Sequence, residues 1–177
     1  MRYTRLPELD HPLAWLRLLR ADDIGPWYAA LSQPQVFEHT SWNLQAAREL
    51  AVYAQPPDPT DAAAMLRLAI AARDDDRLLG TAGFHSVWPP DRRAEIAYDL
   101  VPAAWGQGLA TAAVKALLDW GHGHVGLVRI QATVLVSNAP SLAVLARCGF
   151  AREGLLRSYR QVRGRSGDFW LYAHVAP

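Results

Sequence analysis

The clearest alternation of apolar and polar residues runs from residue 94 to residue 101. One side of this segment presents Ala94, Ile96, Tyr98 and Leu100, and the other presents Glu95, Ala97, Asp99 and Val101. Successive side chains of a strand point to opposite faces, so this spacing predicts a strand with two distinct faces. Further strands are predicted at residues 13–19, 65–73, 78–87, 127–136, 154–162 and 168–175.

Polar turns join two pairs of these predicted strands. The sequence RDDDR separates 65–73 from 78–87, which predicts a hairpin, and the Gly-rich RGRSG joins the last two strands. Residues 1–12 are interpreted as a lead-in to the first strand, and PPDPTD at 56–61 as a loop.

Two short helices are predicted between the first strand and that loop. Asp22 or Asp23 is expected to cap the first, which ends by Pro34. Thr40 or Ser41 is expected to cap the second, which stops at the prolines that open the loop.

Two further helices follow the alternating strand. The first begins after residue 108 and is expected to pack through Leu109, Ala112, Ala113, Ala116, Leu117 and Trp120. The second runs from Asn138, its cap, to Arg147, with Gly149 just past its end. Strands separated by helices in this order predict an α/β or α+β fold with a mixed sheet.

Composition narrows the classes of protein that fit. The chain has 177 residues, and 51% of them are hydrophobic, which suits a single domain over residues 1–177. Its net charge of +1 does not favour nucleic acid as the main partner. One cysteine excludes an internal disulfide, and no apolar run approaches the roughly 20 residues of a membrane span. A cytoplasmic location is expected, with no membrane association.

Two glycines, Gly106 and Gly108, stand immediately before a predicted helix in the sequence AWGQGLATAAVKALLDWG. The first turn of a helix exposes N–H groups that have no internal partner, and the helix dipole favours an anion there. The spacing matches neither a Walker loop nor a dinucleotide fingerprint. The motif therefore indicates either an anion site or a plain turn from strand to helix.

The order of motifs resembles the GCN5-related N-acetyltransferase (GNAT) family. Gly108 and Ala110 match its pyrophosphate loop, Arg/Gln-x-x-Gly-x-Gly/Ala, whereas Trp105 stands where Arg or Gln is usual. An aromatic residue at that place is found in the subgroup of ribosomal-protein N-terminal acetyltransferases. The pair Asn138 and Ser141, and the sequences CGF, EGLLR and GDFWLYA, are also similar to that subgroup.

The resemblance implies a mostly antiparallel sheet flanked by helices, in which two splayed strands hold acetyl-CoA as cosubstrate. The strand containing residues 96–100 would separate from the strand at 128–136, and its edge would bind the pantetheine arm. The N–H groups of residues 107–110 would bind the pyrophosphate. The cofactor-binding residues implied are Ile96, Tyr98, Leu100, Gln107, Gly108, Leu109, Ala110, Thr111 and Asn138.

Acetyl transfer to an amine requires a base for the ammonium and an acid for the departing thiolate. Glu95 is the first candidate for the base, and Asp99 the second; alternatively, Glu95 is an exposed residue paired with Arg92 or Arg93. Ser141 and Tyr159 compete for the role of acid, although a serine near Asn138 also suits helix capping.

The acceptor amine is left open between a protein N-terminal α-amine and a small amine, amino acid or antibiotic. His85 either lines an acceptor groove or is structural, and the sequence HGH at 122–124 does not predict a metal site. The chain is expected to act as a homodimer. The alternatives to an enzyme are a CoA-binding module without activity and, because residues 147–165 are rich in arginine, a nucleic-acid-binding protein.

Overall fold

The computed structural model describes residues 5–58 and 61–176. Its centre is a seven-stranded sheet with the strand order β1-β2-β3-β4-β5-β7-β6. The strands are β1 (Ala14–Leu18), β2 (Leu66–Ala72), β3 (Leu78–Trp88), β4 (Arg93–Leu100), β5 (Arg129–Leu135), β6 (Ala151–Val162) and β7 (Arg165–Val175). All neighbouring strands are antiparallel except β4 and β5. The predicted mixed, mostly antiparallel sheet is therefore confirmed.

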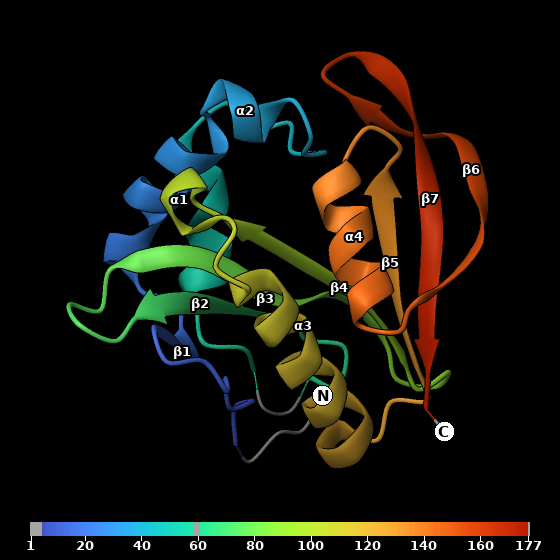
Figure 1. Ribbon diagram of the computed structural model, residues 1–177, viewed down its shortest axis with the longest axis horizontal. Helices are drawn as coiled ribbons and strands as arrows, with labels where there is room; N and C mark the ends of the chain where they lie inside the picture. Colours follow the sequence, from blue (N-terminus) through green and yellow to red (C-terminus); the bar gives the residue numbers. More distant parts are fainter. Residues whose placement is uncertain (1–4, 59–60, 177) are drawn as a thin grey trace.

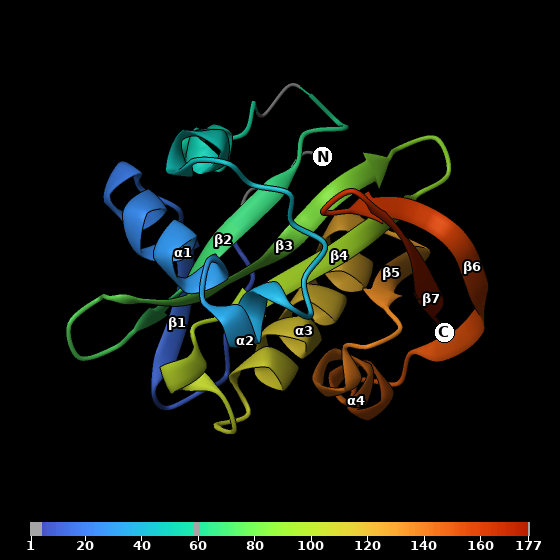
Figure 2. The same ribbon diagram turned by 90° about the horizontal axis from the view of Figure 1, so that it is seen from above.

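Helices cover both faces of the sheet (Figure 2). The α-helices are α1 (Ile24–Leu31), α2 (Pro34–Phe37), α3 (Leu109–Trp120) and α4 (Ala139–Arg147), and short 3₁₀ helices span Ala21–Asp23, Ala47–Ala54 and Pro102–Ala104. One apolar cluster lies beneath α3 and α4, and a second lies beneath α1 and residues 47–54. Strand β2 contributes to both, which explains why its residues are buried on both faces.

Strands β4 and β5 pair over only three residue pairs. Arg93–Glu95 lies parallel to Arg129–Gln131, and no pairing follows. Each strand keeps its partner on the other side, because β4 pairs with β3 as far as Leu100 and β5 with β7 as far as Leu135. Figure 1 shows the two strands diverging from this common start. The predicted splayed pair is thus present.

The segment between Pro34 and residue 46 differs from the prediction. Helix α1 ends at Leu31, before Pro34, as predicted, but Pro34 begins a further helix, α2, because the first helical position needs no N–H donor. The next helix begins at Ala47, not at residue 40 or 41, and the Glu49 carboxylate accepts from the Ala46 N–H at 2.8 Å. The residues between α2 and Ala47 are not helical. Trp42 lies in this segment and packs edge-on against Trp27, with ring centroids 5.8 Å apart.

The last two strands extend closer to each other than predicted, to Val162 and Arg165. Their turn consists of Arg163 and Gly164, both with positive φ, as in the tight turns that suit twisted hairpins. The predicted lead-in and the predicted PPDPTD loop fall partly on residues 1–4 and 59–60, which lie outside the described residues. That residues 1–177 form one domain stays a prediction.

Helix α3 is the longest of the described helices, with 12 residues. A membrane-spanning helix needs about 20 apolar residues. Within residues 5–58 and 61–176, none of the helices meets the length and apolarity needed to cross a bilayer.

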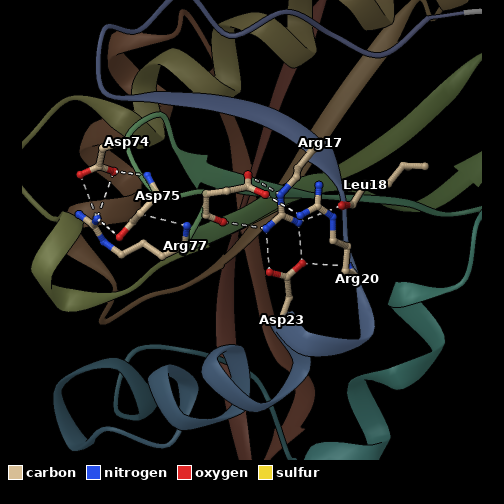
Figure 3. A network of polar contacts seen from close by, with 8 residues as sticks. Arg17, Leu18, Arg20, Asp23, Asp74, Asp75 and Arg77 are labelled. Atoms are coloured by element: carbon tan, nitrogen blue, oxygen red, sulfur yellow. Dashed lines mark hydrogen bonds and ion pairs between the residues drawn. The ribbon is translucent and has the colours of Figure 1, made fainter.

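A buried arginine joins β1 to the tip of the β2–β3 hairpin (Figure 3). Arg17 donates to both Asp23 oxygens at 2.7 and 2.9 Å and to Asp76 at 3.0 Å. Asp23 occupies the N-cap position of α1, as one of the two predictions had it, but its side chain makes no capping bond, because its oxygens accept from Arg17 and from the Arg20 N–H instead. Burial alone would raise the pKa of Asp23, but the hydrogen bonds and charges of Arg17 and Arg20 outweigh it and lower that pKa.

Arg17→Met is expected to lower the free energy of unfolding by about 3–5 kcal/mol at pH 7, because it leaves the buried Asp23 carboxylate without its cation. Because the pKa of Asp23 is lower in the folded protein than in the unfolded chain, its ionised carboxylate stabilises the wild type at pH values above the usual carboxyl pKa. This stabilisation is lost as the pH falls through the pKa of Asp23 in the folded protein. The difference between the two proteins should therefore persist from pH 7 to about pH 4 and shrink only below it. Urea denaturation at pH 7 and at a series of pH values below about 4 measures it.

Arg77→Met is the matched control at the same hairpin tip. Arg77 pairs with Asp74 and Asp75 at the surface, so its loss should change stability little. Equal losses in the two variants would contradict the importance assigned to the buried pair.

Candidate active site

A cavity of about 260 Å³ opens where β4 and β5 separate. Residues 96–99 of β4 and 132–135 of β5 form two of its walls, and residues 39–42 form a third. The first turn of α4 adds Asn138 and Ser141. The cavity is therefore bordered on one side by the unpaired strand edges and on the other by the segment before residue 47.

The β6–β7 turn holds the 39–42 segment in place. Asn43 donates to Gln161 O at 2.9 Å and accepts from the Arg163 N–H at 2.7 Å. The Arg163 guanidinium donates to Thr40 O at 3.0 Å and lies over the Phe37 ring. These contacts join segments more than 100 residues apart, so only the folded chain shows this wall.

Hydrogen bonds among Asn138, Ser141 and Tyr98 define the corner next to α4. The Asn138 side chain caps α4 by accepting from the Ser141 N–H at 3.1 Å. The Ser141 hydroxyl lies 2.8 Å from the Tyr98 hydroxyl. Burial raises the pKa of Tyr98, so its phenol stays protonated at neutral pH. The alternative that the Ser141 side chain is the helix cap is wrong, because Asn138 supplies that bond.

The glycine loop presents an open backbone at the start of α3. Gly106 and Gly108 have φ values of 73° and 81°, which favour glycine, and no side chain caps the helix. A Cβ at Gly106 would meet nothing within 4 Å, and one at Gly108 would meet only His11 Nε2 at 4.0 Å. The loop therefore leaves room for an anion beside the first N–H groups of a 12-residue helix.

Glu95 is buried, with 3% of its surface exposed. Its Oε1 accepts from Thr133 at 2.5 Å and Arg160 at 3.1 Å, and its Oε2 accepts from Gln131 at 3.2 Å. The alternative of an exposed pair with Arg92 or Arg93 is therefore wrong. Those arginines bind Gly126 O and Asp91 instead.

Asp99 lies four residues further along β4 and lines the cavity. It accepts from Arg67 at 2.5 Å, from Thr81 at 3.0 Å and from Trp27 at 2.9 Å. Burial raises the pKa of Asp99, although those three partners act in the opposite direction. Both carboxylates of β4 thus face an arginine from another strand.

Residues 14–151 match the acetyltransferase (GNAT) domain family. The chain belongs to this family. Among curated relatives, the uncharacterized N-acetyltransferase p20 of Bacillus licheniformis is 39% identical over 107 residues. That alignment covers 60% of each chain, so this chain spans about three fifths of the relative's length.

Solved structures share the GNAT fold over nearly the whole chain. RimJ of Mycobacterium smegmatis, solved with CoA-disulfide, is 29% identical, with a TM-score of 0.73 and coverage of 92% of this chain and 82% of the other. RimL, a ribosomal L7/L12 α-N-protein acetyltransferase, is 20% identical, with a TM-score of 0.80 and coverage of 99% and 98%. The likeness to RimL concerns the fold alone.

The structure brings most predicted GNAT site residues to the cavity or to the loop beside it. Ile96, Tyr98, Asn138 and Ser141 line the cavity, whereas Glu95 lies behind its wall. Leu100 ends β4, and Gln107, Gly108, Leu109, Ala110 and Thr111 form the loop and first turn of α3. Their roles stay predictions.

Tyr159 lies apart from these residues. It is 42% exposed on β6, its ring packs edge-on against Phe169, and it is not among the cavity-lining residues. Its role as acid stays a prediction.

Several cavity residues were missed because their neighbours are distant in sequence. His39, Arg67 and Arg160 line the cavity, and Trp42 and Tyr53 add an aromatic wall. His85 also lines the cavity, in agreement with the interpretation that it lines an acceptor groove. The signal for His85 was weak, since it lies at an irregularity between Phe84 and Ser86 that interrupts the pairing of β3 with β4.

The two histidines near the end of α3, His122 and His124, are partly buried. His122 is bound to Leu127 O at 2.7 Å and to His174 at 3.0 Å. Within the described part of the chain, no three His, Cys, Asp or Glu side chains are grouped to hold a metal ion.

Thr133→Val is expected to lower the free energy of unfolding by about 1–3 kcal/mol, because it removes a 2.5 Å hydrogen bond to the buried Glu95 without changing side-chain shape much. Thr40→Val is the control, since the Thr40 hydroxyl makes only an exposed 3.4 Å bond to Phe37 O. Urea denaturation compares both with the wild type. Equal stabilities for all three proteins would contradict the tight binding of Glu95.

Proposed function

We propose that this protein transfers an acetyl group from acetyl-CoA to a primary amine by direct transfer in a ternary complex, with a protein N-terminal α-amine as the acceptor. The observation that carries the proposal is the cavity between β4 and β5, which is lined by the unpaired parts of both strands, by Asn138 and Ser141, and by the wall at 39–42. The coenzyme would lie along the strand edges, and the acceptor would enter beside the 39–42 wall. That it works as a cytoplasmic homodimer stays a prediction.

The chain offers suitable groups for the coenzyme. The N–H groups of residues 107–110 would hold the pyrophosphate, because the loop leaves room there and the helix dipole favours an anion. The unpaired edge of residues 96–100 would bind the amides of the pantetheine arm in the manner of an added strand. Asn138 and Thr111 lie on the two helices that flank this edge.

The size of the cavity favours the end of a peptide as acceptor. A volume of about 260 Å³ admits an extended chain end but not a folded surface. A curated relative, the ribosomal-protein-serine acetyltransferase of Escherichia coli, is 32% identical over 101 residues and supports a protein acceptor. A free amino acid or another small amine is the alternative that a panel of acceptors would reveal.

The residues at the cavity divide the proton transfers between its two sides. Glu95 is the carboxylate assigned to the amine side, where the ammonium must lose a proton before it attacks the thioester. Ser141 is assigned to the sulfur side, where its hydroxyl, bonded to Tyr98, would donate to the departing thiolate.

Direct transfer is favoured over an acetyl-cysteine. The only cysteine, Cys148, is buried, and its thiol contacts Thr111 O at 3.7 Å. Burial raises the pKa of Cys148, so the reactive thiolate is disfavoured at neutral pH.

Release of free thiol from acetyl-CoA tests the proposal with matched peptides. A peptide with a free N-terminal amine should promote release, whereas the same peptide with a blocked N-terminus should not, and Cys148→Ala should keep most of the activity. Release with small amines alone would refute the acceptor. If the protein binds CoA but releases no thiol with any amine, it is a non-catalytic CoA-binding module. If it binds nucleic acid in a strongly salt-dependent way, and acetyl-CoA does not change that binding, it is a nucleic-acid-binding protein.

Gly108→Val is expected to weaken acetyl-CoA binding at least about tenfold, because a β-branched residue does not tolerate a φ of 81° and the loop must rearrange. Calorimetry on the folded variant measures the affinity. Gly25→Ala is the control, since its Cβ would meet open space and its φ is not positive. Wild-type affinity in Gly108→Val would show that the loop is only a turn.

Ser141→Ala is expected to lower kcat by about 10- to 10⁴-fold, the range from a lost hydrogen bond to full acid catalysis. The cap of α4 survives, because it uses the Ser141 N–H and not the hydroxyl. Steady-state kinetics and a thermal melt are compared with Ser32→Ala, which removes an exposed hydroxyl at the end of α1. A normal kcat in Ser141→Ala would show that Ser141 is not the acid and would leave Tyr159 as the candidate.

A further inference from the structure

The position of Glu95 does not allow an acceptor amine to reach it directly. Its two oxygens already accept hydrogen bonds from Thr133, Arg160 and Gln131, and it is not among the residues that line the cavity. With 3% of its surface exposed, Glu95 leaves an ammonium in the cavity no open approach to its oxygens. Another group must therefore stand between Glu95 and the amine.

His85 occupies that place. It lines the cavity, its side chain is 26% exposed, and its Nε2 lies 3.5 Å from Glu95 Oε1. The distance is long for a hydrogen bond but suits an ion pair once the imidazole carries a proton. The Nδ1 atom is buried and has no hydrogen-bond partner among the described residues.

We propose that His85 accepts the proton that the acceptor ammonium loses, and that Glu95 is a positioning residue that acts through His85. The inference rests on the proposed acetyl transfer. The N–H bond of the ammonium breaks and an N–H bond forms at the imidazole Nε2, the nitrogen beside Glu95, which leaves a neutral amine with a free lone pair. The amine nitrogen then bonds to the acetyl carbon as the carbon–sulfur bond breaks. Ammonium and thioester thus give amide, thiol and one proton, which His85 passes to solvent.

The charges around His85 suit a group that is neutral at rest. Burial lowers its pKa, Glu95 on β4 raises it, and Arg67 on β2 and Arg160 on β6 lower it again, with a net decrease. A neutral imidazole keeps the lone pair that a base requires. The other carboxylate of the cavity, Asp99, is paired with Arg67. The other histidine of the cavity, His39, belongs to the 39–42 wall.

The decisive experiment compares kcat as a function of pH in the wild type, His85→Gln and Glu95→Gln, since kcat reports the ionisations of the bound complex. In His85→Gln, kcat should fall about 10²-fold or more and its decline at acid pH should disappear, while acetyl-CoA affinity stays within about twofold. In Glu95→Gln the decline should remain but move to lower pH, because the imidazolium loses its counter-charge. His39→Gln, the matched control, should retain the decline at its wild-type position.

A near-normal kcat with an unchanged profile in His85→Gln would overturn the proposal. So would loss of the acid decline in Glu95→Gln alone, which would make Glu95 the direct base. Circular dichroism establishes that each variant is folded, and His85→Asn provides a second substitution.

An NMR titration of the His85 imidazole separates this inference from the proposed function. Its pKa should be lower in Glu95→Gln than in the wild type, whether or not any amine is acetylated. An identical titration in the two proteins would disprove the coupling. Failure of the wild type to release thiol, with the coupling intact, would instead count against acetyl transfer.

Discussion

Three residue pairs, Arg93–Glu95 of β4 against Arg129–Gln131 of β5, join the two halves of the sheet, and beyond them the strands diverge. Each strand keeps a hydrogen-bonded neighbour on its outer side only. The backbone groups along the opening therefore lack a strand partner, and a buried amide group without one is costly. The divergence creates the cavity, and the amide-rich arm of the proposed coenzyme would satisfy such an edge. The glycine loop follows β4 after a short 3₁₀ helix at Pro102–Ala104, so the proposed anion site comes soon after this edge in the chain.

Buried charges stabilise the walls of this opening. Glu95 and Asp99 lie on one face of β4, and each faces an arginine from another strand, Arg160 of β6 and Arg67 of β2. Removing a charge from water costs several kcal/mol unless a partner and further hydrogen bonds compensate. The pairs therefore tie β2, β4 and β6 to fixed positions around the cavity. His85 lines the cavity between them, with its Nε2 3.5 Å from Glu95 Oε1, which is consistent with its proposed exchange of protons with a substrate.

The regular elements were predictable because they depend on local patterns. The alternation at 94–101 located β4, the apolar face after Gly108 located α3, and Asn138 was correctly predicted as the cap of α4. Prediction was incomplete where a contact between elements overrode a local preference. Asp23 stands at the predicted N-cap position of α1, but its carboxylate binds Arg17 of β1 instead of the helix.

The sequence by itself determined the order of strands and helices, the glycine loop and the family resemblance, because these follow from periodicity and from motifs within a few residues. It also identified which side chains share a face of β4. Only the tertiary structure decided what that face meets. Thr133, Arg160 and His85 surround Glu95 from three other strands, and their separations of up to 65 residues leave no local pattern. Periodicity specifies the direction of a side chain, whereas the distances that govern proton transfer are set by how the strands pack.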